Sequence, residues 1–169
     1  MVTDTDRKHL RRAVELAREA LDAGDSPFGS VLVSGDGKVL AEDRNREGSG
    51  DATRHPEFDL ARWAATHMTP DERARATVYT SGEHCTMCAA AHAWVGLGRI
   101  VYAVSSQQYR QWRTELGVTR ESPVRPLPIQ DVAPFVKVEG PVSEFEQEVH
   151  ELHCRAFDAR KVSGAPPER

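Results

Sequence analysis

The chain has 169 residues, of which 22 are lysine or arginine and 26 are aspartate or glutamate, so its net charge at pH 7 is −4. This length fits one domain that can bury a core, and three cysteines do not suggest a disulfide framework. The charge balance disfavours an extended nucleic-acid surface, which needs a basic face. No apolar run approaches the ~20 residues of a membrane span, and the charged stretch from Asp4 to Arg12 does not have the pattern of a signal peptide. We therefore expect a cytoplasmic protein with reduced thiols and no membrane partner.

The first part of the chain predicts a helix followed by a β-hairpin. Apolar residues at three- and four-residue spacing predict a helix from Asp6 to Ala23, and Gly24 is placed to end it. The apolar run 30–33, the glycine-containing turn 35–38 and the returning strand 39–46 predict an antiparallel pair at one edge of a sheet. A polar loop over 47–54 follows.

The middle of the chain alternates helices with strands. A helix is predicted over 56–67, and Thr69 begins the pattern of a capping box with a proline at the first helical position. Strands are predicted at 77–80 and 99–104, with a helix between them that ends at Gly96. A further helix is expected over 105–115.

The C-terminal third is less regular. The segment 121–134 contains four prolines and is expected to be mostly loop, with a short strand near Ile129. A strand is expected over 135–139, and Ser143 begins a second capping-box pattern that opens a final helix. We expect one domain over residues 1–160 and a mobile tail over 161–169. This order of elements implies an α/β fold, with helices on both faces of a central mixed sheet.

The segment Thr80 to His92 carries the main chemical signal. Cys85 and Cys88 are three residues apart, directly after a predicted strand and at the start of a predicted helix. Two thiols at a helix N-terminus can hold one metal ion, because the helix end favours their thiolate forms. Taken alone, the pair is equally consistent with a redox pair, half of a structural zinc site or two buried thiols.

The tripeptide His55-Pro56-Glu57 lies about 30 residues upstream and supplies what a catalytic zinc site needs. His55, Cys85 and Cys88 make three protein ligands and leave the fourth tetrahedral position for water. Glu57 can act on that water as a base without being a ligand. Proline is tolerated in the first turn of a helix, so Pro56 is compatible with a helix that carries His55 and Glu57 near its start.

The combination of His55, Glu57, Cys85 and Cys88 resembles the zinc-dependent cytidine deaminase superfamily, whose signature is H-x-E followed by P-C-x-x-C. The chain departs from that signature at His84, where the family usually has proline. The resemblance implies an α/β/α sandwich of three layers with a mixed, five-stranded sheet, one zinc ion and a homodimer.

The resemblance also indicates residues that contact the substrate. Phe28, in a Pro-Phe-Gly turn before a strand, and Asn45, at the end of the next strand, match family positions near the substrate. Trp94 lies six residues after Cys88, as in the guanine deaminase branch. The alternative for Phe28 and Trp94 is core packing. His84 either points into the pocket or is a loop histidine that faces solvent.

The resemblance implies hydrolytic deamination of a free heterocyclic base, which is either a guanine-like purine or a smaller amino-pyrimidine or amino-triazine. One alternative is a tRNA adenosine, nucleoside or nucleotide deaminase, although the net charge makes a nucleic-acid partner less favoured. Another is a structural zinc domain without catalysis, in which His84, His92 or Cys154 supplies a fourth ligand. Packing is favoured for Cys154, and a polar role without a metal for His92.

Overall fold

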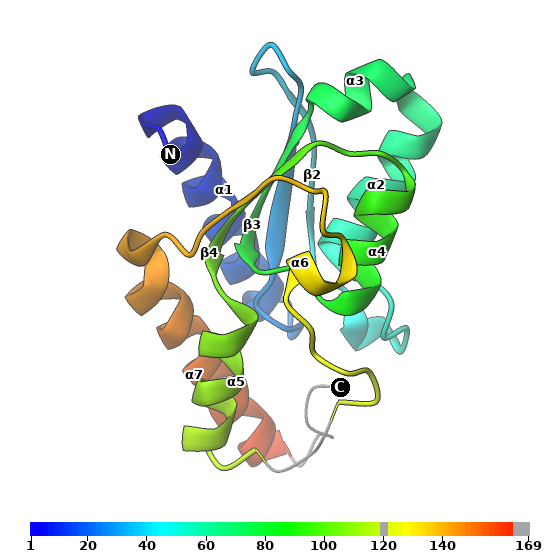
Figure 1. Ribbon diagram of the computed structural model, residues 1–169. Coiled ribbons are helices and arrows are strands. Elements are labelled where there is room, and N and C mark those ends of the chain that lie inside the picture. The colour runs from blue at the N-terminus through cyan, green and yellow to red at the C-terminus, as the bar shows by residue number, and fades with distance from the viewer. Residues whose placement is uncertain (119–121, 164–169) are drawn as a thin grey trace.

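A five-stranded mixed sheet forms the centre of the molecule (Figure 1). The computed structural model describes the backbone of residues 1–118 and 122–163, and side chains as far as residue 161 at the C-terminal end. Strand β1 pairs antiparallel with β2 and β3, whereas β3, β4 and β5 run parallel. The strands lie in the order β2-β1-β3-β4-β5, with bounds β1 Gly29–Val33, β2 Val39–Arg44, β3 Thr77–Gly82, β4 Arg99–Val104 and β5 Val138–Glu139.

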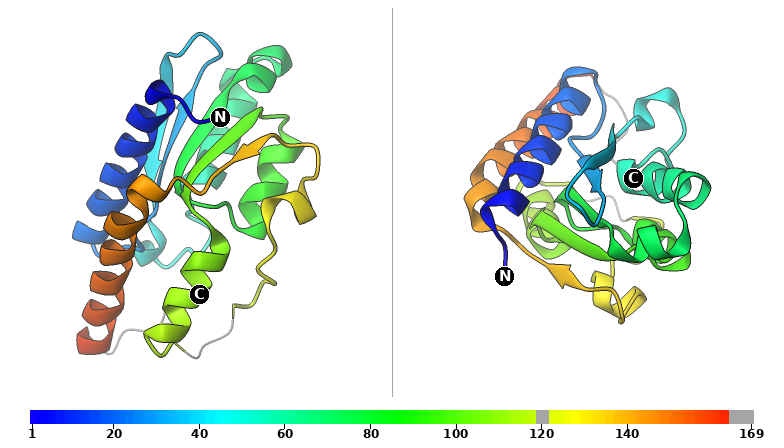
Figure 2. Two further views of the ribbon diagram at one scale, coloured as in Figure 1. Left: turned by 60° about the vertical axis from the view of Figure 1, so that its left-hand side comes forward. Right: turned by 90° about the horizontal axis from the view of Figure 1, so that it is seen from above.

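Helices cover both faces of this sheet, as Figure 2 shows. One face carries α1 (Asp4–Asp22) and α7 (Glu146–Ser163), with α5 (Ser106–Glu115) packed against α7. The other face carries α2 (Pro56–His67), α4 (Thr86–Trp94) and the short α6 (Ile129–Val132). The pleat of β1 explains the two cores, because Val31 and Val33 pack beneath α1 while Leu32 packs beneath α2. The predicted fold, an α/β/α sandwich of three layers, is confirmed.

Local sequence signals account for most helix ends. Thr3 and Asp6 form a capping box at the start of α1, and Gly24 follows the helix with a positive φ of 87°. The capping box predicted at Thr69 is present and opens α3 (Pro70–Arg75). The helix predicted over 105–115 is α5, which Ser105 and Gln108 cap in the same way.

Gly29 of the Pro-Phe-Gly turn has a packing reason. A Cβ atom at this position would lie 2.4 Å from the Ala13 carbonyl oxygen and 2.6 Å from the Ala17 backbone nitrogen. Helix α1 therefore packs directly against the backbone of β1, and only glycine leaves room for it. This contact fixes the strand that contains Ser30 and directly follows Phe28.

Two predictions for the C-terminal third are wrong. Ile129 begins the helical turn α6 rather than a strand, and the Glu83 carboxylate accepts a hydrogen bond from its backbone nitrogen at 3.0 Å. That carboxylate also accepts from the Ser106 nitrogen at 2.8 Å, so one side chain holds two helix starts. The capping box expected at Ser143 does not form. A 3₁₀ turn (Ser143–Phe145) precedes α7, because the buried side chains of Val142 and Phe145 anchor this segment to the core.

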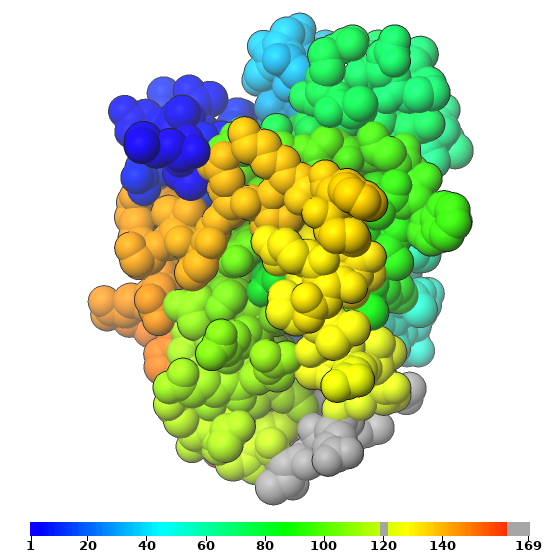
Figure 3. All heavy atoms as spheres, viewed as in Figure 1, coloured from blue at the N-terminus to red at the C-terminus, as the bar shows by residue number. Residues whose placement is uncertain are grey.

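The predicted boundary at residue 161 falls inside a helix. Helix α7 continues to Ser163, and the remainder of the predicted tail, residues 164–169, lies outside the described residues. Figure 3 shows the described segment 122–137 crossing one face of the molecule between α5 and α4. Within the described part of the chain, no helix has both the length and the apolar character to cross a membrane.

Candidate metal centre and active site

Three metal-binding side chains meet where α2 and α4 begin. The Nδ1 atom of His55 lies 3.6 Å from the sulfur of Cys85 and 3.6 Å from that of Cys88, and the two sulfurs are 3.5 Å apart. Among the described residues, this is the only group of three or more histidine, cysteine or acidic side chains placed to hold one metal ion.

These distances fit a tetrahedral zinc ion. With bonds of about 2.3 Å to sulfur and about 2.0–2.1 Å to nitrogen, tetrahedral angles place two sulfurs about 3.8 Å apart, and a sulfur and a nitrogen about 3.6 Å apart. The observed separations of 3.5 and 3.6 Å are close to both values. The donor set of one imidazole and two thiols also suits zinc.

Helix starts position the cluster. His55 is the residue before the first turn of α2, Pro56 occupies that turn, and Cys85 has the same place before α4. Neither His55 nor Cys85 caps its helix with a side-chain hydrogen bond. Their side chains instead point toward each other, and the positive ends of both helices face the cluster. Cys88, one turn further along α4, is buried beneath it.

The ionisation of the cluster is strongly coupled. Burial alone lowers the pKa of His55, but the neighbouring Cys85 and Glu47 side chains raise it above its usual value. The pKa of the Cys85 thiol is lowered, first by its contact with Cys88 and then, against burial, by His55. Burial raises the pKa of Cys88. These shifts pair a Cys85 thiolate with a protonated His55, and a bound metal ion would take the place of the proton on His55.

Glu57 lies on the first turn of α2, with its carboxylate buried beside the cluster. Its Oε1 atom accepts hydrogen bonds from the hydroxyls of Thr80 at 2.8 Å and Ser30 at 3.1 Å. Burial raises the pKa of Glu57, against the opposing effects of His55 and Thr80. A carboxyl whose pKa is moved toward neutrality can both accept and donate a proton at physiological pH.

Sequence reasoning missed the residues that hold Glu57 and His55. Ser30 and Thr80 are fully buried hydroxyl residues on adjacent strands. A hydroxyl in a strand expected to be buried needs a hydrogen-bond partner, and that was the available signal. Glu47 accepts a hydrogen bond from His55 Nε2 at 2.9 Å. It comes from a polar loop without a motif, so no pattern in the sequence marks it.

The structure brings Phe28 and Asn45 close to this region. The backbone nitrogen of Asn45 donates to the Phe28 carbonyl at 2.9 Å, and the buried Asn45 side chain accepts from the Glu47 nitrogen at 2.9 Å. The Phe28 ring is half-buried and lies 5.0 Å, centroid to centroid, from the ring of His153 on α7. Tyr109 on α5 contacts the same two rings. No motif pointed to Tyr109 or His153 as neighbours of Phe28.

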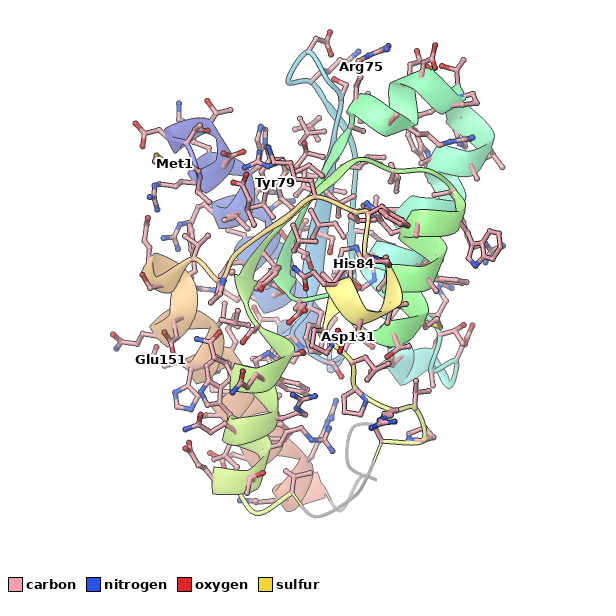
Figure 4. All side chains as sticks on the ribbon, viewed as in Figure 1. Met1, Arg75, Tyr79, His84, Asp131 and Glu151 are labelled. Atoms are coloured by element: carbon pink, nitrogen blue, oxygen red, sulfur yellow. The ribbon has the colours of Figure 1, made fainter. Side chains whose placement is uncertain are left out.

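His84 is buried rather than facing solvent, with 1% of its surface exposed. Its ring lies 5.3 Å from the ring of His92 on α4, and Figure 4 labels it. Burial lowers the pKa of His84 well below its usual value, so the ring is neutral. Neither ring nitrogen has a hydrogen-bond partner among the described residues.

Trp94 does not join the cluster, because its side chain at the end of α4 is 89% exposed. His92 is buried and its Nε2 atom contacts the Gly98 carbonyl oxygen at 2.9 Å, as expected for a polar role without a metal. Cys154 lies on α7 beside His150, outside the cluster. Within the described part of the chain, no fourth protein ligand accompanies His55, Cys85 and Cys88.

This fold and cluster define the cytidine deaminase-like class of proteins, and comparisons with known proteins agree. A model of MafB19-like deaminases matches residues 4–130, and the chain belongs to this family. A solved guanine deaminase from Nitrosomonas europaea superimposes with a TM-score of 0.65 at 18% identity, covering 94% of this chain and 86% of that one. The likeness at this identity concerns the fold.

Curated relatives with different substrates resemble the chain. A probable cytosine deaminase of Schizosaccharomyces pombe is 31% identical over 63% of this chain and 64% of its own length. A guanine deaminase of Bacillus subtilis is 38% identical over 56% of this chain and 61% of its own length. A tRNA-specific adenosine deaminase of Agrobacterium fabrum is 35% identical over 57% of this chain and 64% of its own length. The chain spans less than two thirds of the length of each of these relatives.

Proposed function

We propose that the protein is a zinc-dependent hydrolase that removes an amino group from a free heterocyclic base and releases ammonia. The observation that carries this proposal is the buried Glu57 carboxylate beside a cluster of only three protein ligands in the described chain. A structural zinc site would use four. When bound, the metal would supply Lewis acidity that makes a water molecule acidic near neutral pH.

Glu57 moves the protons in this proposal. Water adds to the ring carbon that bears the amino group, and the carbon–nitrogen bond then breaks. Glu57 takes one proton from the water and delivers it to the ring nitrogen. It then takes the second proton from the new hydroxyl and delivers it to the amine, which leaves as ammonia while a carbonyl forms. Thr80 and Ser30 hold the carboxylate in place through their hydroxyls. One positioned carboxyl with a raised pKa suits these successive transfers.

The residues that would contact the substrate are proposed from their positions near the cluster. Phe28 offers an aromatic surface against a flat ring, and Asn45 offers an amide to a ring edge. His84 is a further candidate for a polar contact, because its neutral ring is buried one residue from Cys85 with both nitrogens available. Relatives acting on cytosine and on guanine fit a free base. The tRNA adenosine alternative needs a basic surface, which the net charge of −4 disfavours.

The test is an ammonia-release assay with the zinc-loaded protein over guanine, adenine, cytosine, amino-triazines and the matching nucleosides. We expect turnover of at least one free base. For the matching nucleoside we expect a kcat/KM at least about 100-fold lower, because a substrate site that is specific for a free base must exclude the sugar. Comparable turnover of base and nucleoside would contradict the free-base proposal. Turnover of a tRNA adenosine alone would support the alternative.

A further inference from the structure

A chain of hydrogen bonds links the C-terminal helix to His55. Arg160 Nη2 donates to the hydroxyl of Ser26 at 2.9 Å, and that hydroxyl donates to Glu47 Oε2 at 2.9 Å. The other oxygen of Glu47 lies 2.9 Å from His55 Nε2. The contacts join α7, the loop after α1 and the loop before α2. They continue to the metal cluster through the opposite nitrogen of the same imidazole.

The geometry fixes the direction of each hydrogen bond. A serine hydroxyl has one proton, so accepting from Arg160 leaves that proton for Glu47. Glu47 is then an acceptor on both oxygens, which requires His55 to carry its proton on Nε2 and to present Nδ1 to the two sulfurs. Metal-binding histidines generally need such a partner to fix their tautomer and ring orientation.

The link is shielded from water along much of its length. Ser26 is 1% exposed, and the Glu47 side chain is 19% exposed. Helix α7 runs alongside α1, as Figure 2 shows, and Arg155 pairs with Asp22 near the end of α1. The last turns of α7 are therefore held beside the loop that contains Ser26. Because the contacts are shielded, they are screened less than surface contacts.

We propose that Glu47 is a positioning residue for His55, and that Arg160, acting through Ser26, couples the docking of the end of α7 to metal binding. This inference rests on the proposed function in one respect, that His55 is a metal ligand. Coupling between two binding events is reciprocal. Metal binding should therefore stabilise the last turns of α7, and loosening those turns should weaken metal binding.

The first test measures the zinc dissociation constant by chelator competition, with urea unfolding of the metal-free proteins as the check on folding. We expect Glu47→Gln to bind zinc about 10- to 100-fold more weakly, and Arg160→Gln several-fold more weakly. The double variant should bind no more weakly than Glu47→Gln alone, because both substitutions break one chain of contacts. Lys161→Gln, which removes an exposed positive charge from the residue next to Arg160 on the same helix, is the matched control and should bind zinc as the wild type does.

The second test measures hydrogen exchange in residues 155–161 with and without zinc. We expect zinc to slow exchange there in the wild type, in Lys161→Gln and, partly, in Arg160→Lys, which keeps a donor, but not in Arg160→Gln. Unchanged zinc affinity in a folded Arg160→Gln would overturn the coupling. If Arg160→Gln does not fold, a folded Ser26→Ala variant with wild-type zinc affinity would overturn it equally, because it removes the hydroxyl that joins Arg160 to Glu47. A wild-type chain that binds no zinc would overturn the proposed function itself.

Discussion

Glu57 and His55 each depend on neighbours that keep the side chain in one orientation. Two hydroxyls hold the Glu57 carboxylate, and one carboxylate holds the His55 ring. Such supporting contacts matter because a reactive group displaced by about 1 Å can lose about 100-fold in rate. Under the zinc proposal, three side chains bind the metal and Glu57 transfers protons, so the two roles can be tested by separate substitutions.

We predict one zinc ion per chain, and a near-total loss of zinc in Cys85→Ala and in Cys88→Ala, because each removes one of three ligands. The measurement is elemental analysis of the purified proteins. Cys154→Ala is the control and should keep full occupancy, since Cys154 lies outside the cluster. Loss of zinc in Cys154→Ala would make the site a structural one with four ligands.

At the scale of elements, a partly buried ion pair fastens α1 to the sheet. Asp6 accepts hydrogen bonds from Arg99 on β4 at 2.7 Å and from the hydroxyl of Tyr79 on β3 at 2.7 Å, and Figure 4 labels Tyr79. Burial alone would raise the pKa of Asp6, but hydrogen bonds from Arg99, Thr3 and Tyr79 outweigh it and hold the pKa well below its usual value. The folded state therefore stabilises the charged carboxylate.

We predict that Asp6→Asn lowers the free energy of unfolding at pH 7 by about 2–3 kcal/mol, the size expected for charged hydrogen bonds. Because the folded pKa lies below the unfolded one, this contribution is complete above about pH 4 and is lost as the pH falls through the folded pKa. Urea unfolding at pH 7 and pH 3 measures this contribution. The difference in the free energy of unfolding between Asp6→Asn and the wild type should be smaller at pH 3. The exposed Asp4→Asn is the control. A difference in the free energy of unfolding that does not change with pH would contradict this account.

The contact between α1 and β1 gives a second prediction at this scale. Gly29→Ala places a methyl group against the backbone of α1, at 2.4 Å from the Ala13 carbonyl oxygen. Backbone cannot rotate away as a side chain can, so we expect the free energy of unfolding to fall by about 1–3 kcal/mol. Thermal unfolding measures the change. A melting temperature equal to that of the wild type would mean that α1 shifts freely on the sheet.

At the scale of the whole molecule, the sequence predicted the layers, the sheet and the metal cluster, because local motifs, the order of the elements and the family resemblance together indicate them. Hydrophobic spacing marked α1, and glycine and proline marked the ends of elements. What could not be predicted depends on contacts between distant segments. The turn at Ile129 is held by Glu83 from another part of the chain, and Glu47 reaches His55 across a loop.

The candidate substrate-contacting residues were predicted from single positions in the resemblance, and the structure places them differently from one another. Phe28 and Asn45 are joined by a backbone hydrogen bond and lie beside the loop that holds His55. Trp94 is exposed, because it ends α4 on the side away from its buried residues. The homodimer implied by the resemblance stays a prediction, which sedimentation of the purified protein checks.

The central claim is that Glu57 carries the protons at a zinc site, and turnover by zinc-loaded Glu57→Gln tests it most directly. Glutamine keeps the size of the side chain but cannot exchange protons as a carboxyl does. The zinc should remain, because Glu57 is not among the three residues placed to hold it. General acid–base groups contribute about 10²- to 10⁴-fold in rate, and we expect the upper end or more, because one residue serves several transfers. The result predicted is one zinc per chain with kcat reduced at least about 1,000-fold. More than about a tenth of wild-type activity at full zinc occupancy would contradict the account.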